Sequence, residues 1–251
     1  MVTSDLGLVG DVMSGHSKWA KIHRQKEVED AAKGRLFSKL VRAISLAVKK
    51  GGPNPQANAS LRVAIEQAKS ANMPKENIER AISKADKEGE KLEEITYEGF
   101  GPAGIAVVVE VATDNRNRTG QEIKNLFERA GGRLAGPGAV SFNFVPKGYI
   151  LIKKNADVQS QMLKLIDLGI DDVEEAEDGI EVYTSPDKFF EIQEKISENK
   201  FEIISRELIK KPKNFIRITD PEKEKKALDF LDALSEHEDV QNVFSNVDIP
   251  E

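Results

Sequence analysis

The 251-residue sequence has no cysteine, one tryptophan and three histidines. The absence of cysteine excludes disulfides and thiolate zinc sites and fits a reducing cytosol, so we expect a cytoplasmic protein. No run of apolar residues approaches the ~18 that a membrane span needs, so no membrane partner is expected. With so few histidines and no nucleophile-elbow motif G-x-S-x-G, the sequence offers few candidates for a nucleophilic catalytic triad. We therefore predict no catalytic residues and no small-molecule cofactor.

The histidines do not form a metal-binding pattern. His16 and His23 could share one face of a helix, but the zinc motif H-E-x-x-H does not occur. We predict no metal site.

Negative charge exceeds positive charge overall, but positive charge is concentrated near the N-terminus. The chain has a net charge of −6, yet residues 14–88 contain 16 Lys and Arg against 8 Asp and Glu. Residues 89–251 contain 21 against 33. A cationic N-terminal part joined to an anionic remainder is typical of proteins with a polyanionic partner, most often nucleic acid.

The most basic stretch, residues 15–26, combines four cations with the only tryptophan and has no carboxylate. The cations could contact phosphates, and the indole could stack on a base. Trp19 could equally anchor this stretch on neighbouring helices. The candidate nucleic-acid contacts here are His16, Lys18, Trp19, Lys21, Arg24 and Lys26.

Residues 30–50 have the periodicity of an amphipathic helix with one apolar face and one cationic face. We expect the cationic face to point away from the core. No acid alternates with its cations, which favours a contact with nucleic acid. A cationic face that is simply solvated is the alternative. The cations added to the candidate contacts are Arg35, Lys39, Arg42 and Lys49.

The remaining pattern predicts three parts. Helices at 58–71 and after Pro74 complete a helical bundle, and charged residues 87–94 predict a linker. Strands are expected at 105–111 and 139–145 around a helix at 118–130, and residues 149–208 form a complete βαββαβ pattern. A strand, a helix and a strand close the chain between 215 and 244.

We therefore expect an α+β multidomain protein, in which an N-terminal helical bundle is followed by two ferredoxin-like α+β domains, one inserted in the other. The expected boundaries are a leader or tag at 1–13, a helical basic domain at 14–92, a discontinuous α+β domain at 93–147 plus 213–251, and an inserted α+β domain at 148–212.

A second polar run, residues 113–119, lies between an apolar strand and the start of a helix. Backbone N–H groups and guanidinium groups at such a position can hold phosphate oxygens. An ordinary capped turn would use the same residue types. The candidate contacts here are Asn115, Arg116, Asn117 and Arg118.

Asp114 in the same run leaves one enzymatic alternative open, a phosphate-ester hydrolase. That chemistry would need a second carboxylate, and folding would have to gather Glu98, Glu110 or Asp114 around a metal. The letters G-x-G-x-x-G at residues 99–104 precede a strand and include Pro102, so they do not predict a dinucleotide site.

Taken together, these stretches resemble the YebC/PmpR family, which includes the mitochondrial translational activator of cytochrome oxidase subunit one. The match lies in residues 15–26, 37–39, 51–55, 58–62, 72–75, 97–99 and 113–119. The resemblance implies three domains, no established enzymatic activity and a transcriptional regulator that binds DNA. Other members resemble translation factors that assist stalled ribosomes. The family's basic signature falls on Lys18, Lys21 and Lys26, and its polar loop on residues 115–118.

We therefore predict a non-enzymatic, nucleic-acid-binding regulator of gene expression, specifically a DNA-binding transcriptional regulator. The alternative is a ribosome-associated translation factor that contacts ribosomal RNA or tRNA and assists stalled elongation. Charge alone does not separate DNA from ribosomal RNA, because phosphate contacts carry no sequence information.

Overall fold

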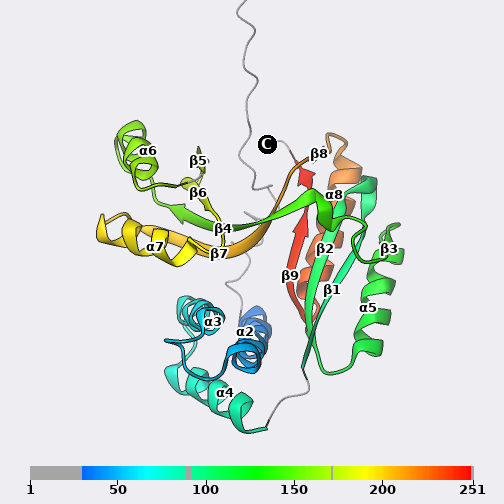
Figure 1. The fold of residues 1–251 in the computed structure, drawn as a ribbon. Helices are drawn as coiled ribbons and strands as arrows, with labels where there is room; N and C mark the ends of the chain where they lie inside the picture. The colour runs from blue at the N-terminus through cyan, green and yellow to red at the C-terminus, as the bar shows by residue number, and fades with distance from the viewer. Residues whose placement is uncertain (1–29, 89–91, 171, 250–251) are drawn as a thin grey trace, which may run out of the picture. The chain divides into compact units, whose positions relative to one another are not determined.

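The computed structural model describes residues 30–88, 92–170 and 172–249 (Figure 1). Its N-terminal part is made of the helices α2 (Asp30–Gly51), α3 (Ala59–Ser70) and α4 (Lys75–Glu88). Their facing sides bury Ile44, Leu61 and Ala68 completely. Asn58 caps α3 by accepting a hydrogen bond from the backbone N–H of Leu61 at 3.0 Å. The predicted helical bundle is confirmed.

The first sheet is antiparallel and has the strand order β3-β1-β2-β9. Its strands are β1 (Glu93–Phe100), β2 (Ala106–Thr113), β3 (Arg133–Ala135) and β9 (Val240–Ser245), and its helices are α5 (Arg116–Arg129) and α8 (Pro221–Glu236). The two helices cover one face of the sheet (Figure 1). Phe127 of α5 and Phe230 of α8 meet edge to face beneath it, with ring centroids 4.9 Å apart. A separate short parallel pair is formed by β8 (Ile216–Arg217), which precedes α8 in the chain, and β10 (Val247–Asp248), which follows β9.

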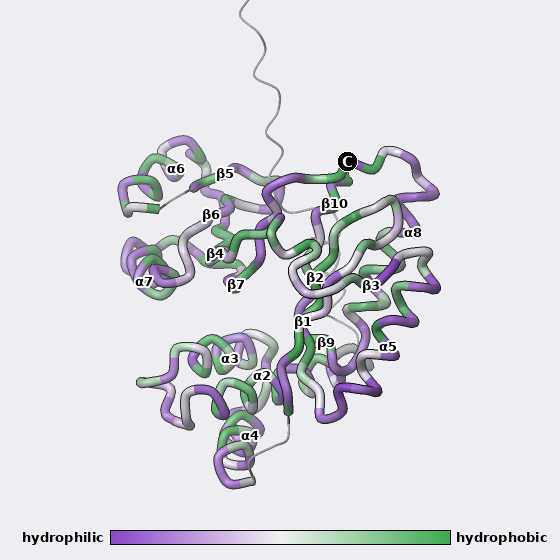
Figure 2. The backbone as a smooth tube through the Cα atoms, turned by 45° about the vertical axis from the view of Figure 1, so that its right-hand side comes forward, coloured by the Kyte–Doolittle hydropathy of each residue, from purple (hydrophilic) through white to green (hydrophobic). Residues whose placement is uncertain are grey.

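Strand β2 is hydrophobic along most of its length (Figure 2) because both of its faces are covered. Val107, Val109 and Val111 belong to the core under α5 and α8. On the other face, Ala112 clusters with Leu46 of α2 and with Leu92. The helical part therefore packs against this sheet.

The second sheet has the strand order β5-β6-β4-β7. Its strands are β4 (Phe144–Ile152), β5 (Asp172–Glu175), β6 (Ile180–Thr184) and β7 (Ile203–Pro212). The helix α6 (Val158–Asp167) connects β4 to β5, and α7 (Phe189–Glu198) connects β6 to β7. In the order of the unit's own strands this is second, third, first, fourth, which is the ferredoxin-like arrangement. Gly148 on β4 lets α7 approach, since a Cβ there would lie 2.5 Å from the ring of Phe189.

The chain packs as two compact units. One contains Lys147–Leu208, and the other contains the described residues before and after that segment. The predicted fold class is confirmed: an α+β multidomain protein with N-terminal helices followed by two α+β domains, one inserted in the other. No helix within the described ranges is both long and apolar enough to cross a membrane.

Two details of the predicted order are wrong. The linker predicted at 87–94 overlaps both the end of α4 and the start of β1. The strand predicted at 139–145 is a turn followed by the short 3-10 helix η2 (Ser141–Asn143), and β4 begins only at Phe144. Glu98 is the physical reason, because its carboxylate accepts the backbone N–H groups of Gly138, Val140 and Ser141 and holds them out of a sheet. A second 3-10 turn, η1 (Pro102–Gly104), connects β1 to β2.

Candidate functional site

Six of the predicted nucleic-acid contacts lie outside the described residues. They are His16, Lys18, Trp19, Lys21, Arg24 and Lys26. Their assignment stays a prediction.

The cationic face of α2 does not point wholly to solvent. Arg35 near the start of the helix is exposed. Lys39, however, donates from Nζ to the carbonyl oxygen of Ser235 in α8, and Lys49 donates to the carbonyl oxygen of Leu92 at 2.9 Å. The cationic face therefore lies only partly in solvent, because α2 packs against the α+β part. Whether these cations also contact nucleic acid stays a prediction.

Asp239, in the turn between α8 and β9, is an acceptor on which several elements converge. Its side chain is 2% exposed. Arg42 of α2 pairs with Oδ1, Arg118 of α5 donates from Nη2 to Oδ2 at 2.7 Å, and the Thr119 hydroxyl donates to Oδ2 at 2.5 Å. Burial opposes ionisation, but the hydrogen bonds from Thr119, Arg42 and Arg118 outweigh it and lower the pKa of Asp239 to about 2. An ionised carboxylate thus links α2 and α5 to this turn.

The predicted polar loop forms the cap and first turn of α5. Asn115 is the N-cap, and its side chain accepts from the Arg118 backbone N–H at 3.1 Å. Thr113 Oγ1 accepts from the Asn115 backbone N–H at 2.9 Å. The capped-turn alternative therefore describes the local structure of this run, while the side chains of Arg116 and Asn117 are exposed on the helix.

Glu122, His237 and Asp239 have ligand atoms within 4.8 Å of one another, which is a spacing that a metal ion could use. The atoms are already engaged with protein groups. His237 Nδ1 accepts from the Asp239 backbone N–H at 3.1 Å, and Nε2 lies 3.0 Å from Glu122 Oε2. A cation would also have to compete with the guanidinium groups of Arg42 and Arg118 at Asp239. The cluster is therefore best described as a hydrogen-bonded network.

The carboxylates of the hydrolase alternative do not gather in the described part of the chain. Glu98 is buried and occupied by three N–H groups of residues 138–141 at 2.8–2.9 Å. Burial opposes ionisation of Glu98, but these hydrogen bonds outweigh it and hold the pKa of Glu98 below its usual range. Glu110 pairs with Lys210 at 2.6 Å, and Asp114 lies exposed at the start of the α5 cap.

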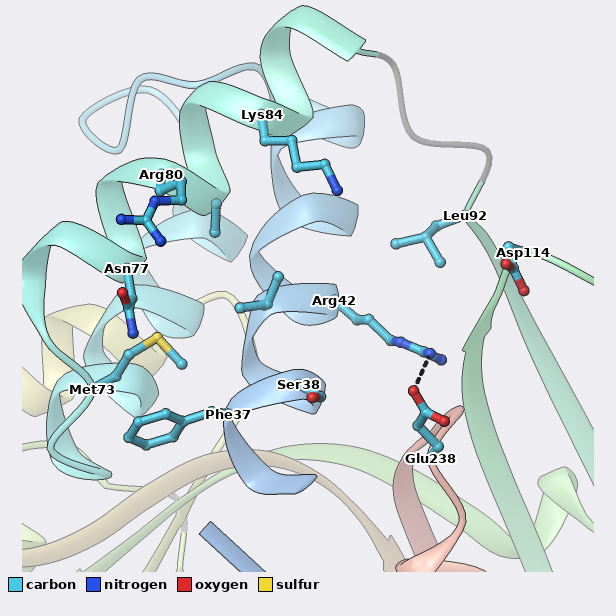
Figure 3. A pocket seen from close by; sticks show the side chains of 12 residues that line it. Phe37, Ser38, Arg42, Met73, Asn77, Arg80, Lys84, Leu92, Asp114 and Glu238 are labelled. Atoms are coloured by element: carbon cyan, nitrogen blue, oxygen red, sulfur yellow. Dashed lines mark hydrogen bonds and ion pairs between the residues drawn. The ribbon is translucent and has the colours of Figure 1, made fainter. Parts of the chain in front are cut away.

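A cavity of about 790 Å³ opens between α2, α4 and the turns that lead into α5 and β9 (Figure 3). One face of α4 forms a polar wall, and α2 provides an aromatic and aliphatic wall. The lining residues are Phe37, Ser38, Val41, Arg42, Met73, Asn77, Arg80, Ala81, Lys84, Leu92, Asp114 and Glu238. Of these, sequence reasoning singled out only Arg42 and Asp114 for function. The signal it missed is the spacing of Asn77, Arg80, Ala81 and Lys84, which places these four on one face of a helix.

Two family models match the chain. The model described as the TACO1/YebC protein N-terminal domain matches residues 17–88, and the one described as the TACO1/YebC second and third domain matches residues 92–247. The chain belongs to the TACO1/YebC family. The predicted resemblance to the YebC/PmpR family is therefore confirmed.

Curated relatives agree along almost the whole chain. A protein of Dictyoglomus turgidum is 45% identical over 243 residues, covering 95% of this chain and 97% of the relative. A protein of Aquifex aeolicus is 45% identical over 242 residues with the same coverage, and one of Thermotoga maritima is 43% identical over 241 residues, covering 94% of each. All three are named "probable transcriptional regulatory protein". The family thus carries the name of regulators and not of enzymes.

A solved structure has the same fold. The crystal structure of a conserved hypothetical protein from Aquifex aeolicus matches with a TM-score of 0.81 and 44% sequence identity. The match covers 88% of this chain and 93% of that one.

Proposed function

We propose that this protein is a non-enzymatic regulator of gene expression that acts in the cytoplasm and binds DNA through its N-terminal helical part. The observation that carries the proposal is the division of charge: 16 Lys and Arg against 8 Asp and Glu in residues 14–88, and 21 against 33 in residues 89–251. The relatives' name, probable transcriptional regulatory protein, supports the regulatory role.

The charge division favours a local contact. Exposed cations of the described helical part include Arg35, Lys69, Lys75, Arg80 and Lys87. The anionic remainder would be repelled by phosphates, so a duplex wrapped around the whole protein is disfavoured. Nucleic acid that contacts only the helical part meets a favourable positive electrostatic potential.

The test is the salt dependence of binding by the full chain. If the helical part neutralises about four to six phosphates of a DNA duplex, log affinity falls against log salt with a slope of roughly −3.5 to −5.5. Fluorescence anisotropy with a labelled duplex of mixed sequence measures this slope between low and physiological salt. A flat response would contradict the proposal.

A charge-reversal variant locates the binding surface. Lys18→Glu, Lys21→Glu and Lys26→Glu together should weaken binding strongly and flatten the slope by about one unit for each phosphate that is no longer neutralised. The matched control reverses three exposed lysines of the α+β part, Lys164, Lys188 and Lys225. Equal decreases in affinity for both variants would point to net charge instead of a site.

The same titration addresses the translation-factor alternative. Ribosomal RNA offers the same phosphates as DNA, so a structured ribosomal RNA fragment is titrated beside the duplex at the same salt concentration. Much tighter binding to the RNA would favour the ribosome as the site of action.

A further inference from the structure

We propose that the cavity between α2 and α4 binds one unpaired nucleotide of a single-stranded nucleic acid. The base lies against Phe37, and the neighbouring phosphates lie at Arg80 and Lys84. The inference rests on the proposed nucleic-acid function and specifies the form of nucleic acid that this cavity takes.

The walls of the cavity differ in chemistry as the parts of a nucleotide do. Phe37, Val41 and Met73 provide an apolar wall, and Figure 3 shows Phe37 and Met73 beside each other at one end. Phe37 is half-buried, so its ring is held by the helical core while part of it still faces the cavity. An aromatic face held in this way can stack on any base.

The cationic wall belongs to α4. Arg80 and Lys84 are four residues apart, exposed, and on the helix face that lines the cavity. Asn77 lies one turn before Arg80 on the same face, and its amide can both donate to and accept from a base edge. Phosphate groups along this wall would therefore contact two cations, next to the apolar wall that holds the base.

The wall of the cavity opposite α4 is acidic, and we expect it to orient the bound nucleic-acid strand. Asp114 and Glu238 line it, and Arg42 on this side is held by Glu238 at 2.9 Å and by Asp239. Phosphates are repelled from these carboxylates and attracted to α4, so the backbone should follow Arg80 and Lys84 while the base points inward. The cavity, at about 790 Å³, lies in the size range of small-ligand sites. A base paired within a duplex cannot enter it.

The first experiment replaces the aromatic face. Phe37→Leu keeps an apolar side chain in the helical core and removes the stacking ring. Single-stranded 12-nucleotide ribo- and deoxyribo-oligonucleotides that carry 2-aminopurine are added to the full chain. Wild type should quench the 2-aminopurine, and the variant should lose this quenching and bind at least about fivefold more weakly. The two sugar types show whether RNA or DNA is preferred.

The second experiment changes only exposed residues, so it leaves the apolar core of the helical part intact. Arg80→Ala with Lys84→Ala should weaken single-strand binding more than duplex binding. The matched control is Lys69→Ala with Lys75→Ala, which removes the same charge from exposed positions of the helical part that do not line the cavity. Duplex affinity should change by a similar, smaller factor in both pairs.

The outcomes separate this inference from the proposed function. Duplex binding by wild type together with unchanged single-strand binding and unchanged quenching in Phe37→Leu would overturn the cavity site alone. Equal decreases in single-strand affinity for the test and control pairs would also overturn it, because the cations would then act only through net charge. Failure of wild type to bind either form would overturn the proposed function as well.

Discussion

At the scale of single residues, Asp239 is a buried side chain that links the helical part to the first α+β domain. It is buried, ionised and bonded to Arg42 and Arg118, which come from different helices. Sequence reasoning could not find it, because it follows Glu236 and Glu238 in what looks like an ordinary acidic turn. Its partners are 197 and 121 residues away, and only folding brings them near.

Asp239→Asn should lower the free energy of unfolding by about 2–4 kcal/mol, because two guanidinium groups lose their buried counter-charge. Urea denaturation at pH 7 measures the change. Asp114→Asn is the control, since Asp114 is exposed and also contacts Arg118, at 3.2 Å. That variant should change stability by less than about 0.5 kcal/mol. Similar decreases in stability for both would show that Asp239 has no special role.

The pH dependence of stability follows from the same group. The pKa of Asp239 falls from 3.8 to about 2 on folding, so the folded state favours the ionised form. Its contribution, about 2 kcal/mol, is essentially complete at about pH 5 and is lost progressively as the pH falls through 3.8 towards 2. Denaturation at pH 5, 4, 3 and 2.5 should show this decrease in wild type, and Asp239→Asn should flatten the profile over that window.

Arg116 and Arg118 stand two positions apart but should behave differently. Arg118→Ala should lower the urea midpoint, because it removes a hydrogen-bond donor from Asp239. Arg116→Ala should leave the midpoint nearly unchanged, since its side chain is exposed, and should weaken nucleic-acid binding if the predicted contact is real. A decrease in the stability of Arg116→Ala with normal binding would make both arginines structural.

At the scale of elements, periodicity predicted the helices well but did not predict the strand β1. Helices α2 and α3 end within one residue of their predicted limits, because their apolar faces repeat regularly. Strand β1 contains Glu98 and Gly99, which both have low strand propensity, and glycine also favours turns. Both are explained by tertiary contacts that a single sequence does not reveal: Glu98 binds the loop at 138–141, and Gly99 leaves room for α5.

Gly99→Ala should therefore destabilise the first sheet by about 1–3 kcal/mol. A Cβ at this position would lie 2.5 Å from the Arg133 carbonyl oxygen and 2.6 Å from the Phe127 ring. Gly136→Ala is the matched control, because no atom lies within 4 Å of a Cβ there. The control should be neutral or slightly stabilising in thermal unfolding. Equal melting temperatures for the two variants would contradict the close packing of α5 on β1.

At the scale of the whole molecule, the division of charge was visible in the sequence. That some of the cations bond groups of the α+β part was not. Lys39, Arg42 and Lys49 belong to the cationic helical part, yet each contacts the α+β part. Lys39 bonds Ser235 of α8, Arg42 pairs with Asp239 in the turn before β9, and Lys49 bonds Leu92 just before β1. Part of the positive charge thus holds the helical part in place. The proposal assigns the basic stretch at 15–26 and the exposed cations of α4 to nucleic acid.

The emission of Trp19 tests that proposal most directly. It is the only tryptophan of the chain and lies within the basic stretch, so tryptophan emission, excited at a wavelength that the three tyrosines do not absorb, reports on this segment alone. We expect a solvent-like emission that is quenched as DNA or structured RNA is added, at the concentrations and with the salt dependence seen by anisotropy. A blue-shifted emission that does not respond to nucleic acid would mean that Trp19 is an anchor on the helices and that nucleic acid does not reach the basic stretch.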